Sequence, residues 1–307
     1  MAPVYALFLG PVAAALVLAV LIWLRPGSRG ERSPGAALRG WTIAAAAVPL
    51  LVVIGRQVLA IPLVTLRLPY PVPGSPAGPW FVWPILLGLV ALVLLLLPLP
   101  ARRGQRTAEL SRRTMWTFTS GRLFVSFVAL LAVTVAVTVA AGLASEPDEG
   151  GRYRTYSVQN GDFSMGTQIY GWYYSVPALV LLAVTVLVVI GALILIARPR
   201  LALEENRERD MDLRRLRSRN VILTALGGVA VHLGLVLASL SATSTMRGSV
   251  PADAGDLSHF GTPFAALTSA LAFAGACLVT VGLTAWLSVL LSVIPVPHRS
   301  RTTADRP

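Results

Sequence analysis

The amino-acid sequence predicts an all-α membrane protein: a bundle of seven transmembrane helices, with the N-terminus outside the cell and the C-terminus in the cytoplasm. The 307 residues are 55% hydrophobic and only 13% charged, with a mean hydropathy of +0.70, whereas soluble domains carry about 25% charged residues. Seven apolar segments supply the roughly 20 residues that cross a bilayer core of about 30 Å. Arginines are concentrated in alternate connections between these segments, which sets the orientation.

The seven segments form one helical transmembrane domain, residues 1–307, because no connection between them is long enough to build its own core. The second segment is the least regular, since Arg56 and Gln57 lie inside it. No Asp or Glu lies within any segment, which weighs against transporters that use intramembrane acids to couple to protons or cations. The predicted spans are residues 4–24, 42–62, 80–99, 123–143, 176–197, 221–241 and 264–290.

The distribution of charge predicts the side on which each connection lies. All 26 basic residues are Arg, and with 14 acids they give a net charge of +12. The connections after the first, third and fifth spans hold four, six and eight arginines and the C-terminal tail holds three, whereas the other five lie on the opposite side. Because positive residues stay in the cytoplasm, this pattern places a multi-pass protein in the plasma membrane. Topology accounts for the charge, so we expect no nucleic-acid partner.

The connection of residues 144–175 is predicted to be an extracellular loop rich in aromatic residues. Asn160 and Gly161 form a dipeptide that is typical of a type I′ hairpin turn. Two interpretations follow: a small hairpin that caps the bundle or binds a ligand, or an aromatic belt at the membrane interface before the fifth span. The aromatic residues are Tyr153, Tyr156, Phe163, Tyr170, Trp172, Tyr173 and Tyr174.

The connection of residues 198–220 is predicted to be a charged cytoplasmic helix that continues into the sixth span. Acids precede bases by four residues in the pairs Glu205/Arg209 and Asp210/Arg214, a spacing that stabilises an exposed helix. Residues 291–307 are predicted to be a cytoplasmic tail. Since the longest stretch outside the membrane is about 30 residues, any ATPase or DNA-binding activity has to come from another chain.

Three polar residues within the predicted spans are candidate functional residues. His232 lies near the centre of the sixth span, where an ionisable group is costly and often functional. We expect it to be a neutral imidazole that is hydrogen-bonded to a neighbouring helix. Cys277 lies at a depth that allows contact with His232, but two ligands do not make a metal site. Arg56, in the outer half of the second span, either extends to the interface or contacts an anion or an outer-loop carboxylate.

The sequence predicts neither catalysis nor a cofactor. A retinal protein requires a Lys for its Schiff base, and the chain has no Lys. Residues 204–209 match the EExxxR pattern of intramembrane prenyl-type proteases, but these acids fall in the charged cytoplasmic segment. We therefore predict no catalytic residue, no metal site and no cofactor, and an enzyme that acts on lipids is the weakest functional hypothesis.

Short motifs around the fifth span carry a resemblance to known proteins. Residues 171–177, Gly-Trp-Tyr-Tyr-Ser-Val-Pro, open that span, and Arg198 with Pro199 and then Leu213-Arg214-Arg215 precede the next one. This arrangement resembles a group of uncharacterised actinobacterial multi-pass integral membrane proteins, of the kind encoded beside winged-helix repressors and transporter ATPases. The resemblance covers about residues 152–235. It implies a genetic neighbourhood, which includes transporter ATPases, rather than a mechanism, and no catalytic residue can be carried over from it.

Together these features predict a non-enzymatic integral membrane protein. The leading hypothesis is a membrane subunit or accessory protein of an ATP-driven export or envelope-stress system. Its cytosolic ATPase would contact residues 101–122 and 198–219, including Arg214 and Arg215. The alternative is a stand-alone membrane sensor or small-molecule carrier that uses the outer aromatic loop and His232. The lipid bilayer is a partner in either case.

Overall fold

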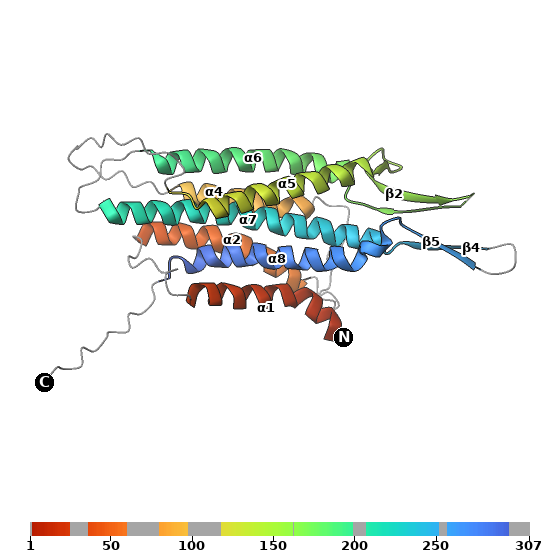
Figure 1. The fold of residues 1–307 in the computed structure, drawn as a ribbon, viewed down its shortest axis with the longest axis horizontal. Helices are drawn as coiled ribbons and strands as arrows, with labels where there is room; N and C mark the ends of the chain where they lie inside the picture. The colour runs from red at the N-terminus through yellow and green to blue at the C-terminus, as the bar shows by residue number, and fades with distance from the viewer. Residues whose placement is uncertain are drawn as a thin grey trace.

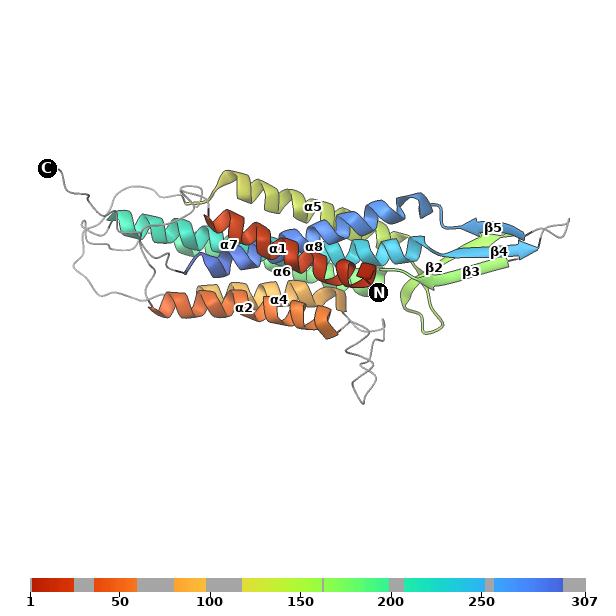
Figure 2. The ribbon, with the colours of Figure 1, turned by 90° about the horizontal axis from the view of Figure 1, so that it is seen from below.

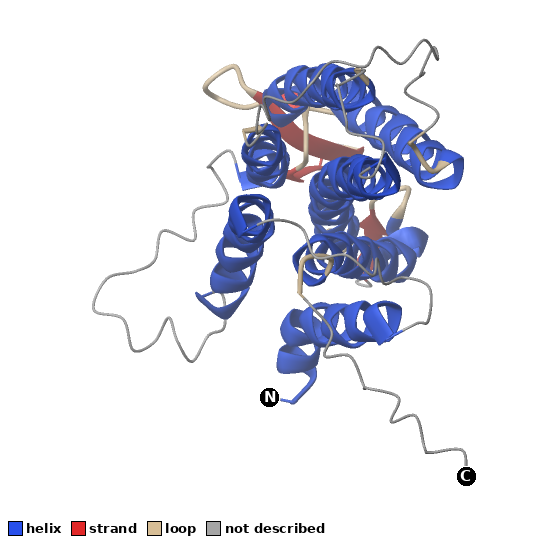
Figure 3. Cartoon of the chain, turned by 90° about the vertical axis from the view of Figure 1, so that its left-hand side faces the viewer, coloured by secondary structure: helices blue, strands red, loops and turns tan. Residues whose placement is uncertain are grey.

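The computed structural model of the protein is mostly α-helical and describes residues 2–24, 36–59, 80–97, 118–161, 163–198, 207–251 and 257–294. Seven α-helices within these residues lie side by side along the longest axis of the molecule (Figure 1), and an end-on view shows them as one bundle (Figure 3). They are α1 (Ala2–Leu24), α2 (Ala36–Leu59), α4 (Trp83–Leu96), α5 (Gly121–Leu143), α6 (Trp172–Ala197), α7 (Arg207–Ser244) and α8 (Thr268–Leu291).

Five of the described helices are long and apolar enough to cross a membrane, which identifies a membrane-embedded helical protein, as the composition predicts. Two further apolar helical stretches, Gly10–Leu24 and Trp83–Leu96, are shorter than a full span. The five long stretches are Ala36–Arg56, Gly121–Leu143, Trp172–Ala197, Asp210–Ser244 and Ala265–Leu291. Most of the predicted tail, residues 295–307, and most of the predicted contact segment 101–122 lie outside the described residues.

The central element of the bundle is α7, which contacts α4, α5, α6 and α8. The predicted charged helix and the sixth span form one continuous helix of 38 residues that begins at Arg207, about 57 Å long at 1.5 Å per residue. Of its apolar stretch 89% is buried, against 17% for α5, most of whose apolar side chains are therefore at the surface of the bundle. These four helices thus surround α7, whereas α1 packs mainly against α8, and α2 against α4 and α8.

Glycines allow α7 and α8 to approach each other closely. A Cβ atom added to Gly234 of α7 would lie 2.8 Å from the carbonyl oxygen of Gly275, and one added to Gly282 of α8 would lie 2.7 Å from that of Gly227. Small residues in such positions let helix backbones pack directly against each other in a membrane. This pair of helices consequently leaves little room for relative movement.

The chain is not wholly α-helical, because two antiparallel sheets extend from one end of the bundle (Figure 2). The first has the strand order β1–β2–β3, and β2 pairs with β3 as a hairpin at the position that Asn160 and Gly161 predict. Gly161 has φ +61°, which the turn requires. The strands are β1 (Glu146–Pro147), β2 (Tyr153–Asn160), β3 (Phe163–Gln168), β4 (Arg247–Pro251) and β5 (Leu257–Gly261).

The second hairpin, β4 with β5, corrects the sequence-based prediction, which places no strand between the sixth and seventh spans. It packs against the first hairpin: a Cβ added to Gly248 would lie 3.1 Å from Met165 Sδ. The rings of Tyr156 and Phe264 meet edge to face at 5.6 Å. We call this side of the bundle the hairpin end. The opposite side, where α1, α4, α6 and α8 end and α2, α5 and α7 begin, is the arginine-rich end.

Candidate functional site

A buried site in the hairpin half of the bundle surrounds His232, which is fully buried in α7. Its Nδ1 lies 2.5 Å from the carbonyl oxygen of Phe81 in the short 3-10 helix Trp80–Val82. A carbonyl can only accept, so Nδ1 carries the proton. In the neutral ring Nε2 is then an acceptor, and it lies 3.4 Å from the hydroxyl of Tyr170. The sequence predicts a hydrogen bond from His232 to a neighbouring helix without naming that helix. The structure places the partner, the Phe81 carbonyl, at the start of the predicted third span.

Tyr170 connects the imidazole to an aromatic cluster. It lies just before α6, is fully buried, and meets Phe81 edge to face at 4.9 Å and Tyr174 in a stacked pair at 6.0 Å. Burial raises the pKa of the Tyr170 hydroxyl above its ordinary value, so the phenol remains a hydrogen-bond donor at neutral pH. We call His232, Tyr170, Phe81 and Tyr174 the His232 cluster.

The His232 cluster lies nearer the hairpin end than the sequence indicates. His232 is at the centre of the predicted span 221–241, but its partners stand at the hairpin-side starts of two other helices: Phe81 directly before α4 and Tyr170 directly before α6. The helix continues for 12 residues beyond His232, about 18 Å. The site thus lies in the hairpin half of the bundle rather than at its middle.

The hairpin end and the His232 cluster are joined by short contacts. Tyr170 follows the last residue of β3, Gln168, by two positions, and the carbonyl of Gln168 accepts a hydrogen bond from Thr243 Oγ1 of α7 at 2.9 Å. Between the cluster and α6, a Cβ added to Gly171 would overlap the carbonyl oxygen of Tyr153 in β2. Only glycine therefore fits where the sheet meets α6.

The ion pair of Asp148 with Arg154 stabilises the β1–β2 turn. The Asp148 carboxylate accepts hydrogen bonds from the backbone N–H groups of Gly150 and Arg152, each at 2.9 Å, and from Arg154 Nε at 2.5 Å. The hydrogen bond from the Arg152 backbone, with those from Arg154 and Gly150, holds the pKa of Asp148 below its usual value. The guanidinium of Arg152 also lies over the ring of Tyr173 at 5.6 Å. The turn is therefore ordered by its own side chains.

Arg214, expected on a surface that contacts a partner, is instead turned into the protein. It is 5% exposed, and its Nη1 donates to the carbonyl oxygens of Ile196 at 3.1 Å and Arg198 at 2.8 Å. The predicted pair with Asp210 is present at 2.7 Å. Because the last carbonyls of a helix lack partners within it, Arg214 caps α6 and is unavailable to another protein.

The adjacent Arg215 has the exposure that a contact residue needs. Its side chain is 61% exposed, and its nearest acid, Asp212, lies 3.7 Å away with a side chain that is 59% exposed. Such surface pairs contribute little to stability. Of the two arginines that the sequence names as partner contacts, only Arg215 faces outward.

The other two intramembrane candidates do not join the His232 cluster. Cys277 is exposed on α8, and it lies two residues, or about 200°, from Gly275, which faces α7; the helix thus turns Cys277 away from His232. Arg56 is exposed in the last turn of α2, where a positive charge is favourable next to the helix C-terminus. Its position fits a side chain that extends toward the hairpin-side interface.

No protein-family model, curated protein or solved structure matches this chain. The resemblance to actinobacterial membrane proteins therefore stays a prediction. The chemistry of the site has to be read from its residues: one imidazole and one phenol, each hydrogen-bonded inside the bundle. Among the described residues no group of three His, Cys, Asp or Glu side chains is placed to hold a metal ion. The arrangement is suited to linking segments by hydrogen bonds.

Sequence reasoning missed the partners of His232 for identifiable reasons. Phe81 contributes a backbone carbonyl, for which no side-chain pattern exists. Tyr170 is one of seven aromatic residues in its loop, and only the neighbouring Gly171 distinguishes it, because a glycine directly before a span signals a close backbone approach. That signal points to the junction between sheet and helix, where Tyr170 is buried.

Proposed function

We propose that the chain is a non-enzymatic plasma-membrane protein of seven spans, with its N-terminus outside. It serves as a membrane subunit or accessory protein of an ATP-driven export or envelope-stress system. In this proposal the hairpin end is extracellular, and α7 transmits its state to a cytosolic ATPase. The observation that carries the proposal is the continuity of α7, one buried helix of 38 residues that contacts structured elements at both ends.

The direction of the helices supports the proposed topology. Figure 1 shows α1, α4, α6 and α8 running toward the arginine-rich end and α2, α5 and α7 running away from it. Successive helices are therefore antiparallel, as in a chain that crosses the membrane seven times. The connections at the arginine-rich end hold most of the 26 arginines, which favours a cytoplasmic location for that end.

The contacts of α7 support a role in coupling. Near the hairpin end, His232 and Thr243 bond to the segments that flank the first sheet. Near the arginine-rich end, Arg214 holds the last carbonyls of α6. Between these two regions, glycine packing holds α7 against α8. A change in the position of the hairpins would therefore displace α7 and α8 together.

The cytoplasmic part of α7 is the proposed contact for the ATPase. Figures 1 and 2 show α7 extending farther than the other helices at the arginine-rich end. Arg215 is exposed on this extension. An acidic surface on a cytosolic protein would complement it.

The experiment that tests this proposal is affinity purification from native membranes in mild detergent, followed by mass spectrometry. We expect an ATPase in stoichiometric amount and a clear loss of it with Arg215→Glu. The control is Arg247→Glu, which reverses an equally exposed arginine on β4 at the other end. Recovery of the intact chain alone, or equal co-purification with both variants, would contradict the proposal.

A second candidate function is a stand-alone membrane sensor or small-molecule carrier. The observation that favours it is that Tyr170, the partner of His232 Nε2, follows the last residue of β3 by two positions, which connects a buried ionisable group to the hairpin end. This candidate predicts that His232→Ala abolishes the response in cells that lack the ATPase, whereas the leading proposal predicts no response in such cells for any variant.

A further inference from the structure

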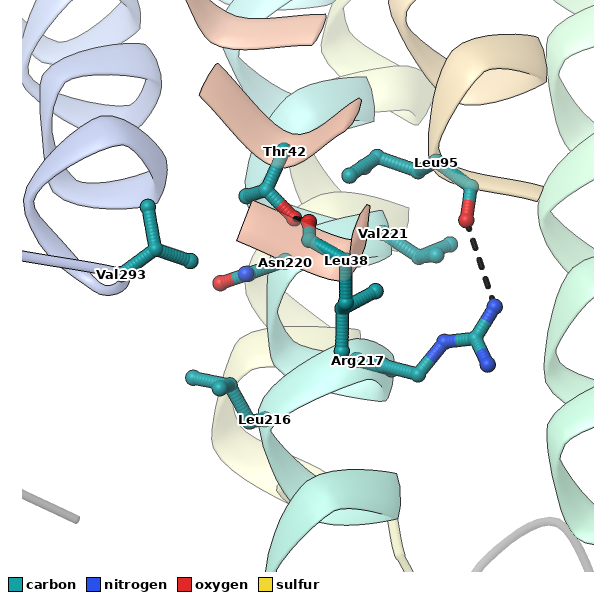
Figure 4. A pocket seen from close by; sticks show the side chains of 8 residues that line it. All are labelled: Leu38, Thr42, Leu95, Leu216, Arg217, Asn220, Val221 and Val293. Carbon is teal, nitrogen blue, oxygen red and sulfur yellow. Dashed lines mark hydrogen bonds between the residues drawn. The ribbon is translucent and has the colours of Figure 1, made fainter. Parts of the chain in front are cut away.

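A small crevice opens at the arginine-rich end, between the first turns of α2, the end of α4, α7 and the residues that follow α8 (Figure 4). Thr42 at its α2 side already donates to the Leu38 carbonyl at 2.8 Å. The remaining walls are mainly apolar, and their side chains are Leu38, Leu95, Leu216, Val221 and Val293. Two polar side chains of α7, Asn220 and Arg217, complete the lining.

Asn220 offers a buried acceptor that no residue of the described part of the chain satisfies. The side chain is 3% exposed, and its Nδ2 donates to Ser292 Oγ at 3.0 Å. The Ser292 hydroxyl itself donates to the carbonyl of Val289 at 2.7 Å, so the serine oxygen must accept and the orientation of the amide is fixed. Oδ1 is then left buried without a hydrogen-bond partner, which is unfavourable until a donor reaches it.

Arg217 places a positive charge on the other side of the crevice. Its Nη2 donates to the Leu95 carbonyl at 3.3 Å. Figure 4 shows the guanidinium extending toward α4, whereas the carboxamide of Asn220 lies on the side of Val293. A ligand that meets both groups must therefore carry a negative charge and a hydrogen-bond donor on separate groups, whereas an inorganic phosphate ion carries both on a single phosphorus atom.

The depth of the crevice fits the boundary between lipid headgroups and acyl chains. Leu38 is the third residue of α2, Leu95 is the last but one of α4, and Val293 lies two residues beyond α8. The crevice is thus bounded by the ends of three apolar helices while α7 continues past it. An amphipathic molecule at this level exposes its polar part to Arg217 and Asn220 and its apolar part to the leucine and valine walls.

We propose that this crevice binds an anionic phospholipid with a hydroxyl-bearing headgroup, of the phosphatidylglycerol type. Its phosphate lies at Arg217, and its headgroup hydroxyl donates to Asn220 Oδ1. Guanidinium groups pair well with phosphate oxygens. The site rests on the membrane placement proposed above, with the arginine-rich end at the inner leaflet. It does not depend on an ATPase, so the two ideas fail independently.

Native mass spectrometry of the detergent-solubilised full chain tests the site. Phosphatidylglycerol, phosphatidic acid and phosphatidylcholine are titrated separately. The first is expected to bind most tightly, since phosphatidic acid lacks the headgroup hydroxyl and phosphatidylcholine lacks both the net charge and the donor. Arg217→Gln, which keeps a donor for the Leu95 carbonyl, should lower the affinity for phosphatidylglycerol by about tenfold. Arg217→Lys should retain most of the affinity, and the exposed Arg215→Gln should retain all of it.

Asn220→Leu isolates the second contact. We expect it to remove the preference for phosphatidylglycerol over phosphatidic acid while leaving the affinity for phosphatidic acid unchanged. An unchanged preference would overturn the proposal, because Asn220 would then be satisfied by a water molecule alone. Equal weakening by Arg215→Gln and Arg217→Gln would also overturn it, since only the general charge of this end would matter. So would full displacement of the lipid by inorganic phosphate, which would identify a free anion as the ligand.

Discussion

The two ends of the helix bundle are held together by different interactions. At the hairpin end, where the connections carry five arginines and six acids, aromatic packing and hydrogen bonds between hydroxyl, imidazole and backbone groups join two sheets to α7. At the other end, with 21 arginines and eight acids, the guanidinium groups of the buried Arg214 and the half-buried Arg217 cap the carbonyl ends of neighbouring helices. Aromatic packing and hydrogen bonds, with the Arg154–Asp148 pair in one turn, hold the nearly balanced end together, whereas guanidinium groups on backbone carbonyls hold the strongly positive end.

This difference shows that the arginines have two separate roles. Their number on one side orients the chain in the membrane, while individual ones such as Arg214 and Arg217 complete helices that end there. The first role depends on the total charge and the second on position. Substitutions at single positions therefore separate the two roles.

The largest effect is expected from removing the α6 cap. Arg214→Ala leaves the carbonyls of Ile196 and Arg198 without their donor and Asp210 without its cation, so we expect a loss of about 3 kcal/mol in the free energy of unfolding. Thermal unfolding of the detergent-solubilised protein measures it. Arg215→Ala, which removes the same charge from an exposed position, should change stability by less than about 1 kcal/mol. Equal losses of stability in the two variants would mean that the buried position of Arg214 adds nothing to the effect of its charge.

A smaller loss is expected at the junction of the first sheet with α6. Gly171→Ala introduces a Cβ that overlaps the Tyr153 carbonyl and Ser145, and such overpacking costs about 1–3 kcal/mol. Gly166→Ala in β3 is the matched control, because its nearest non-local atom, the Tyr156 carbonyl oxygen, would lie at an ordinary 3.8 Å. Thermal unfolding measures the difference. An equal decrease in the unfolding midpoint of both variants would show that the junction is not tightly packed.

Removing one hydroxyl from the His232 cluster should have a lesser effect. Tyr170→Phe preserves the ring contacts but deprives His232 Nε2 of its donor, for which we expect a cost of about 1 kcal/mol. Tyr173→Phe, at a side chain that is exposed rather than enclosed, serves as the control and should be neutral. Chemical denaturation followed by tryptophan fluorescence can compare the two variants. A stable Tyr170→Phe variant would mean that the imidazole has another partner.

The smallest effect concerns pH and is confined to the hairpin end. The folded-state pKa of Asp148 is held below its ordinary 3.8 by hydrogen bonds from Arg152, Arg154 and Gly150. Its stabilising contribution is therefore complete above pH 3.8 and is lost as the pH falls through the lower folded-state pKa. Hydrogen exchange of the Gly150 and Arg152 amides should accelerate in that acidic range. Asp148→Asn should make this exchange independent of the carboxyl titration, and unaltered pH dependence would exclude Asp148 as its source.

Hydropathy predicts the helices well because every one of the long helices is apolar over most of its length. The turn at Gly161 is predictable because its dipeptide favours a left-handed backbone. The β4–β5 hairpin is not, since its strands contain Gly248, Pro251 and Gly261 and show no strict alternation. Helical spacing correctly pairs Asp210 with Arg214 but cannot reveal that α6 ends beside them, because this depends on how two distant segments pack.

We expect α7 to couple the two ends of the bundle, and hydrogen–deuterium exchange on the His232→Ala variant measures this coupling. Cys277→Ala, on the exposed face of α8, is the control. Coupling predicts faster exchange in two places: the strands β2 and β3, and the amides around Arg214 at the other end of the helix. Faster exchange limited to the hairpin end, with the Arg214 region as slow as in the control, would contradict the claim.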